Sequence, residues 1–230
     1  MRGIAVTFAL LAACTTAAAM EFRTIGSTLV MSGPVTGHDL AQLKDHLAPG
    51  KVKLVLLACS SGGDLWNGLQ MGERIREEGL PTAVAGRCAS SCALVFLGGT
   101  VRSASDGTAL KGTRLGLHGP HSRSTKAVSL KNAARLAHYI DRMTGGKYPP
   151  ALLERTVYIA HAQDIVYIYH PAVRGSPSAS GVVACLHAEG QARSCEPVEG
   201  MDALSIGVLT QREVMALDPE VKALLQPVAE

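Results

Sequence analysis

Short apolar runs alternate with amphipathic segments along residues 28–143 of the chain. The run over 52–58 is almost continuously apolar, which is typical of a strand covered on both faces of a parallel sheet. Further strands are predicted over 28–31, 82–86 and 113–118, and helices over 38–47, 64–79, 88–97 and 130–143. Strands that alternate with helices indicate an α/β fold, in which repeated βαβ units build a mainly parallel sheet.

Three loops lie where predicted strands give way to helices: SSGGD at 60–64, GRCASS at 86–91 and HGPHS at 118–122. In such sheets, ligands and catalytic groups gather outside the ends of the strands, where loops and helix N-termini meet. The sequence therefore predicts that the functional site is built from these loops.

The loop GRCASS places a serine just after a strand, at the first turn of a helix. Unpaired backbone N–H groups and the positive end of the helix dipole at this point favour an activated hydroxyl and its oxyanion. One N–H from this turn and one from SSGGD could converge as an oxyanion hole, and His118 is the natural general base. Taken singly, the serine could be a plain helix cap and the histidine a structural residue; their combination favours a serine hydrolase.

Residues 28–169 resemble the proteolytic subunit of the Clp protease, in the Clp/crotonase superfamily, and in particular its exported, periplasmic branch. The segment SSGGDLWNGLQMGERIREEGLPTAVAGRCASSCALVFLGG, at 60–99, is similar to the family's glycine turn, helix, strand and Gly-x-x-x-Ser helix. The resemblance implies a Clp/crotonase-like fold of repeated ββα and βαβ units. It also implies a serine peptidase that needs no cofactor, acts on a peptide or protein and forms a homo-oligomer.

The same resemblance implies roles for individual residues. Ser90 matches the nucleophile, and the backbone N–H groups of Ser91 and Gly63 match the oxyanion donors. The segment RLGLHGP is similar to the strand end that bears the catalytic histidine, which selects His118 rather than His121.

The third member of the triad is expected after the following helix, shortly before an aromatic or aliphatic stretch. The segment AHAQDIVYI falls there and offers Asp164, whose carboxylate would orient the imidazole. Asp141, on the preceding helix, is the alternative. The sequence also departs from the family's pattern, because Ser61 replaces the proline of the glycine turn, which leaves the backbone donors in place.

The first 19 residues have the layout of a secretory signal. Arg2 precedes an apolar run at 4–13, followed by small residues. Cleavage is expected before Met20, or before a lipidated Cys14, because Leu-Ala-Ala-Cys resembles the lipobox of bacterial lipoproteins. An ordinary apolar strand is the alternative. The mature protein is therefore expected in the periplasm or cell envelope, touching the membrane only through such a lipid.

Export would place the chain in an oxidising compartment, where disulfides persist. The cysteines beyond the signal segment are therefore candidates for disulfides. Cys185 and Cys195 flank a polar loop and are expected to bridge a hairpin. His187 between them makes a metal site conceivable, but no fourth ligand is evident, and no metal is expected. Cys88 and Cys92 form either a short bridge or two separate thiols.

Cys59, at the end of an apolar strand, is expected to remain a buried, unpaired thiol.

Composition adds the domain plan and excludes one class of partner. Aromatic residues make up 4% of the chain and the net charge is only +3, so nucleic acid is not an expected partner. The chain divides into a signal segment at 1–19, a Clp/crotonase-like domain at 20–170 and a loop-rich extension at 171–230, with a helix predicted over 211–217.

Three functions fit these observations. The first is an exported serine peptidase that works through an acyl-enzyme, using Ser90, His118 and Asp164. The second is a non-catalytic envelope protein that keeps the scaffold for binding. The third is a crotonase-like enzyme that binds an acyl thioester, which export disfavours because acyl-CoA is an intracellular substrate.

Overall fold

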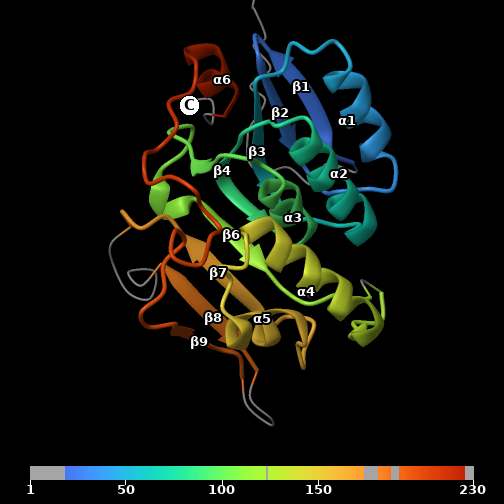
Figure 1. Ribbon diagram of the computed structural model, residues 1–230, viewed down its shortest axis with the longest axis vertical. Coiled ribbons are helices and arrows are strands. Elements are labelled where there is room, and N and C mark those ends of the chain that lie inside the picture. The colour runs from blue at the N-terminus through green and yellow to red at the C-terminus, as the bar shows by residue number, and fades with distance from the viewer. Residues whose placement is uncertain (1–18, 123, 174–180, 188–191, 226–230) are drawn as a thin grey trace, which may run out of the picture.

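One sheet of nine strands runs through the computed structural model, which describes residues 19–122, 124–173, 181–187 and 192–225. The strand order is β1-β2-β3-β4-β6-β7-β8-β9, and β5 pairs with β4 beside this path (Figure 1). The strands are Glu21–Ile25 (β1), Thr28–Ser32 (β2), Leu54–Ser60 (β3), Thr82–Ala89 (β4), Arg102–Ala104 (β5), Arg114–Leu117 (β6), Ile165–Tyr169 (β7), Val182–Leu186 (β8) and Ser194–Pro197 (β9).

The centre of the sheet is parallel and both flanks are antiparallel. Strands β2, β3 and β4 lie parallel in this order, and β4 pairs with β5 at 82–84 and with β6 at 87–89. At one flank β1 is antiparallel to β2, and at the other β7, β8 and β9 follow β6 as antiparallel neighbours. The parallel centre confirms the predicted α/β fold, whereas the antiparallel flanks were not predicted.

The helices cover the two faces of the sheet unequally. Helices α1 to α5 lie on one face, where they share the main apolar core with alternate strand residues, and α6 lies on the other face (Figure 1). Their bounds are Asp39–Leu47 (α1), Leu65–Glu77 (α2), Ser91–Leu97 (α3), Leu130–Thr144 (α4), Pro150–Val157 (α5) and Pro219–Leu225 (α6). Within the described part of the chain, no helix has the length and apolar character needed to cross a membrane.

Most predicted elements of the N-terminal half are present, with one shifted boundary. Asp64 caps α2 as predicted, because its carboxylate accepts a hydrogen bond from the backbone N–H of Asn67 at 2.7 Å. The helix predicted over 88–97 begins only at Ser91. Cys88 and Ala89 still belong to β4, because they pair with β6 of the sheet. The helix is shorter than predicted, and its N-terminus meets the strand at a single residue, Ser90.

The C-terminal segment lies against the outer face of the sheet. Leu217 and Val221 pack on alternate apolar residues of β2, β3 and β4, opposite to the main core. Asp106 holds this segment in place, because its carboxylate accepts from the backbone N–H of Leu217 at 2.9 Å and pairs with Lys222. The last helix thereby completes the packing of strands that come much earlier in the sequence.

The helix predicted over 211–217 is absent, and this prediction is wrong. Residues of that segment instead run beside β5, where Met215 pairs with Ser105 in an isolated parallel bridge. The helix begins later, at Pro219, whose fixed φ suits the first turn of a helix. Strands β8 and β9 also come from the predicted extension and continue the same sheet.

Candidate active site

Ser90 is the single residue between strand β4 and helix α3, and its backbone is strained. Its φ is 57° and its ψ is −131°, a conformation that residues with a Cβ rarely adopt and that costs on the order of 1–3 kcal/mol. Its N–H donates to the carbonyl of Gly116 at 2.7 Å, and its own carbonyl accepts from the N–H of Ala93 at 2.9 Å. A serine on a sharp, strained strand-to-helix turn is the arrangement that exposes a nucleophile.

The glycine turn after β3 packs directly against Ser90. Gly62 has a φ of 81°, and a Cβ at this position would lie 2.5 Å from the Cβ of Ser90 and 2.4 Å from the carbonyl oxygen of Ala89. Any larger residue would push the two turns apart. The glycine at this position therefore allows the close approach that an oxyanion hole built from two turns requires.

The N–H groups of Gly63 and Ser91 are the two predicted oxyanion donors. The N–H of Val35 donates to the carbonyl of Gly62, and the carbonyl of Val35 accepts from the N–H of Asp64. The N–H and the carbonyl of Gly63 itself therefore point away from Val35. Among the described residues, neither of the two N–H groups has a hydrogen-bond acceptor. Both are thus available to a ligand, and the assignment of the two donors remains a prediction.

Ser91 carries a second unpartnered group. The residue is 2% exposed, and within the described part of the chain its hydroxyl has no hydrogen-bond partner. Burying a hydroxyl without a partner is costly, so such a group calls for an explanation. Ser91 lines the same cavity as Ser90, where a bound ligand could satisfy the hydroxyl.

His118 follows β6 and is held by the backbone. Its Nδ1 lies 2.8 Å from the carbonyl oxygen of Gly119. Because a carbonyl only accepts, Nδ1 carries the proton in the neutral ring and Nε2 is the acceptor, as a general base requires. Burial lowers the pKa of His118, and the neighbouring His121, whose ring centroid is 4.9 Å away, lowers it further. The imidazole is therefore neutral at pH 7.

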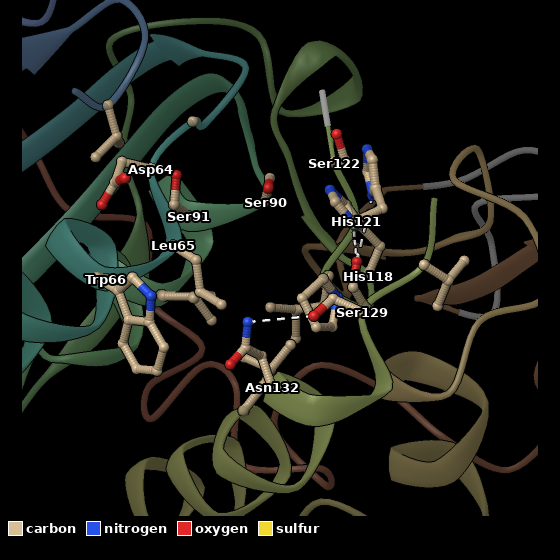
Figure 2. A pocket seen from close by; sticks show the side chains of 18 of the residues that line it. Asp64, Leu65, Trp66, Ser90, Ser91, His118, His121, Ser122, Ser129 and Asn132 are labelled. Carbon is tan, nitrogen blue, oxygen red and sulfur yellow. Dashed lines mark hydrogen bonds between the residues drawn. The ribbon is translucent and has the colours of Figure 1, made fainter. Parts of the chain in front are cut away.

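Ser90 and His118 line one cavity of about 840 Å³. Figure 2 shows Ser90 and Ser91 on one side of it and the His118–His121 pair on another. Within the described residues no hydrogen bond joins Ser90 to His118. The structure thus brings the predicted nucleophile and base to the same cavity without a hydrogen bond between them, and such bonds are often long before a substrate binds.

The remaining walls of this cavity are supplied mainly by the starts of α2 and α4 and by the hairpin after His118. They are both apolar and polar, and include Val35, Asp64, Leu65, Trp66, Leu94, Leu117, Pro120, Ser122, Val128, Ser129, Asn132 and Leu136. Trp66 is fixed at the rim, because the guanidinium of Arg135 on α4 lies 4.6 Å from its ring centroid. The cavity is thus partly apolar and partly polar.

Asp164 is buried but is not bonded to His118. One carboxylate oxygen accepts from the ring Nδ1 and the backbone N–H of His187, both at 2.8 Å. The other accepts from the N–H groups of His161, at 3.0 Å, and Ala160, at 3.2 Å. Burial by itself would raise the pKa of Asp164, but these hydrogen bonds outweigh burial and hold it below the ordinary value.

The place of a triad acid at His118 Nδ1 is taken by the carbonyl of Gly119. Asp141, the alternative acid, is exposed on α4 and is not among the residues that line the cavity. Asp164 lines a neighbouring hollow together with His118. Its role as the acid of the triad stays a prediction. Sequence reasoning missed the Gly119 carbonyl because backbone acceptors leave no residue signature.

Two disulfides are present among the described residues. Cys88 in β4 is bonded to Cys92 in α3, with their Cα atoms 5.3 Å apart, so the bridge spans the turn that carries Ser90. Cys185 and Cys195 join the facing strands β8 and β9, as predicted.

The prediction of a buried, unpaired thiol at Cys59 is wrong. This residue is half-buried and disulfide-bonded. His187, which had suggested a metal site, bonds to Asp164 instead. Within the described part of the chain, no group of three His, Cys, Asp or Glu side chains is arranged to hold a metal ion.

Comparison with known proteins supports the fold. No protein-family model matches the chain, and no curated protein matches it. Among solved structures, ClpP1 from Listeria monocytogenes has a TM-score of 0.50 at 12% identity, with 85% of this chain and 95% of that chain covered. A point mutant of the same ClpP1 has a TM-score of 0.49 at 12% identity, with 86% and 95% covered. The chain therefore has a ClpP-like α/β fold.

Proposed function

We propose that this protein is a serine peptidase that works through an acyl-enzyme, with Ser90 as the nucleophile and His118 as the general base. The observation that carries the proposal is the strained backbone of Ser90 at a strand-to-helix turn, facing a cavity that it shares with His118. Strain of this kind persists only where the surrounding structure enforces it, and it concentrates at active sites.

In the proposed reaction, the Oγ of Ser90 attacks the carbonyl carbon of the scissile peptide bond, and Nε2 of His118 takes the hydroxyl proton. The N–H groups of Gly63 and Ser91 donate to the oxyanion that forms. His118 then gives the proton to the leaving amine, and an ester links Ser90 to the acyl half of the substrate. Water activated by His118 hydrolyses this ester and restores the free serine.

Closure of the cavity on a substrate would bring His118 to Ser90. The Gly119 carbonyl keeps Nε2 as the acceptor in the free protein. Asp164 remains our proposed acid, since it lies in the hollow that His118 also lines, but it would first have to exchange its bond to His187 for one to His118.

A non-catalytic binding protein is the second candidate. It is favoured by the missing hydrogen bond between Ser90 and His118 in the described structure. Covalent labelling of Ser90, considered below, separates the two functions.

The pH dependence of peptide hydrolysis tests the role of His118. The neutral imidazole is the active base, so the rate should fall as the pH drops through the pKa of His118. Burial lowers this pKa below the ordinary value of 6.5, and we therefore expect the acid limb of kcat/KM to have its midpoint below pH 6.5. A steady-state profile from pH 4 to 9 measures it. A midpoint above pH 7 would contradict the assignment.

We further propose that the protein is exported to the periplasm or envelope and assembles with copies of itself. The sequence of residues 1–19 and the disulfides support export, because disulfides persist in oxidising compartments. Cell fractionation with N-terminal sequencing should find the mature chain in the envelope, beginning at Met20 or at a lipid-modified Cys14. Cytoplasmic protein that retains Met1 would contradict export.

A further inference from the structure

A second hollow, of about 550 Å³, adjoins the cavity of Ser90. The two share Ser61, His118 and His121 in their linings. A chain segment laid across the histidine pair can therefore occupy both at once. Apart from His118 and Asp164, the residues that line the second hollow have no part in the chemistry proposed above.

The floor of the hollow is the outer face of the sheet. Ala89 of β4 pairs with Gly116 of β6, which pairs with Tyr167 of β7, so the three lie side by side on one face. Ile165 and Tyr167 are half-buried, whereas the alternate residues of β6 and β7 point into the main core and are buried. Helix α6 covers the same face only over β2, β3 and β4.

Positive charge surrounds this floor. The exposed side chains of Arg87 and Arg193 line the hollow, and Arg114 lies beside Arg87 in the register of β4 and β6. The guanidinium of Arg114 is 5.5 Å from the ring centroid of Tyr167. In the part of the chain that the structure describes, none of the three arginines forms an ion pair.

The hollow has little negative charge to balance these arginines. Among the described residues of its lining, the only carboxylate belongs to Asp164, which is 3% exposed and already accepts four hydrogen bonds. Arg193 donates one N–H to the carbonyl of Gln163, at 3.2 Å, and within the described residues its other donors have no acceptor. Guanidinium groups with free donors bind carboxylates through paired hydrogen bonds.

We propose that this hollow binds a carboxylate of the substrate, so that the protein prefers peptides with an acidic group on one side of the scissile bond. Arg87 and Arg193 bind the carboxylate, while the other side of the peptide lies in the apolar part of the main cavity, beside Leu65 and Trp66. This inference rests on the proposed function, because it takes the cavity of Ser90 as the site where the peptide is cut.

The test is a binding experiment that needs no turnover. Fluorescein-labelled peptides that differ only in two Glu-to-Gln replacements are titrated by fluorescence anisotropy against the full chain carrying Ser90→Ala. The Glu peptide should bind about tenfold more tightly at low salt, and the difference should shrink as salt rises. Arg87→Gln, added to the same chain, should remove most of the difference. Lys44→Gln, which deletes an exposed charge on α1, is the matched control and should preserve it.

Two results would overturn the proposal: equal affinity for the Glu and Gln peptides, or an equal loss of the preference with Lys44→Gln and Arg87→Gln. Peptides with a free or an amidated C-terminus show whether a terminal carboxylate serves as well as a side chain. Labelling of the wild-type Ser90 by a fluorophosphonate decides the proposed function separately. If the wild-type protein is labelled but does not prefer acidic peptides, only this inference is wrong. If it prefers acidic peptides but is not labelled, the peptidase assignment is wrong.

Discussion

Replacing Ser90 with alanine is expected to abolish covalent labelling by a fluorophosphonate and to lower peptide hydrolysis by about 10⁵-fold or more. The reagent reacts with an activated serine hydroxyl, and Ser90 is the serine that the strand-to-helix turn holds in a strained conformation. Labelling followed by peptide mass mapping measures both the extent and the site. Loss of His118 should lower the rate by about 10³-fold or more, as for other members of a triad.

Ser91→Ala is the matched control for this experiment. The variant keeps the backbone N–H that we assign to the oxyanion hole, and its hydroxyl has no partner among the described residues, so substantial labelling should remain. If Ser91→Ala abolished labelling while Ser90→Ala did not, the nucleophile would be the next residue along the chain. If neither variant changed labelling, the reactive residue would lie elsewhere and the assignment of Ser90 as the nucleophile would be wrong.

Replacing Arg102 with methionine should destabilise the protein by about 3–5 kcal/mol. The side chain is 3% exposed, and its guanidinium donates to four carbonyls. Two belong to Leu97, which ends α3, and to Gly99, and the other two to Gly207 and Val208 in the C-terminal segment. Burial lowers its pKa to about 10, so it stays charged at neutral pH. Methionine fills the space but removes the donors to Gly207 and Val208, whereas the carbonyls of Leu97 and Gly99 still accept from Arg76. Equilibrium denaturation in urea measures the loss.

Arg142→Met removes a charged group of the same kind from the surface. Arg142 is half exposed and pairs with Glu73 at 2.6 Å, a contact that solvent screens, so the loss should stay below about 1 kcal/mol. If the free energy of unfolding fell by a similar amount in the two variants, the buried contacts between Arg102 and the carbonyls would contribute little to stability. Because α3 begins next to Ser90, the Arg102 variant that remains folded should also show slower labelling.

The sequence was sufficient to predict the features that depend on local chemistry. The apolar strands, the Asp64 cap and the strand-to-helix turn at Ser90 follow from patterns within a few residues, where propensity and capping act. The disulfide between Cys185 and Cys195 was predictable for the same reason, since its partners flank one hairpin.

Features that depend on distant segments were not predictable. The pairing of Met215 beside β5 overrides the helical spacing of its own segment, because backbone groups at the edge of a sheet need partners. The bonds of Asp164 to His187 join residues whose proximity arises only when β7 and β8 pair. The basic hollow likewise forms only when Arg87 and Arg193 come together across the sheet.

The position of α6 has a consequence for how the chain is made. Part of the apolar outer face of β2, β3 and β4 is covered by Leu217 and Val221, which are synthesised later than every strand of the sheet. Until then, the two side chains that cover this part of the face are absent. Native packing of the sheet therefore waits for this late segment, and a nascent chain exposes an apolar surface that a holding chaperone could bind.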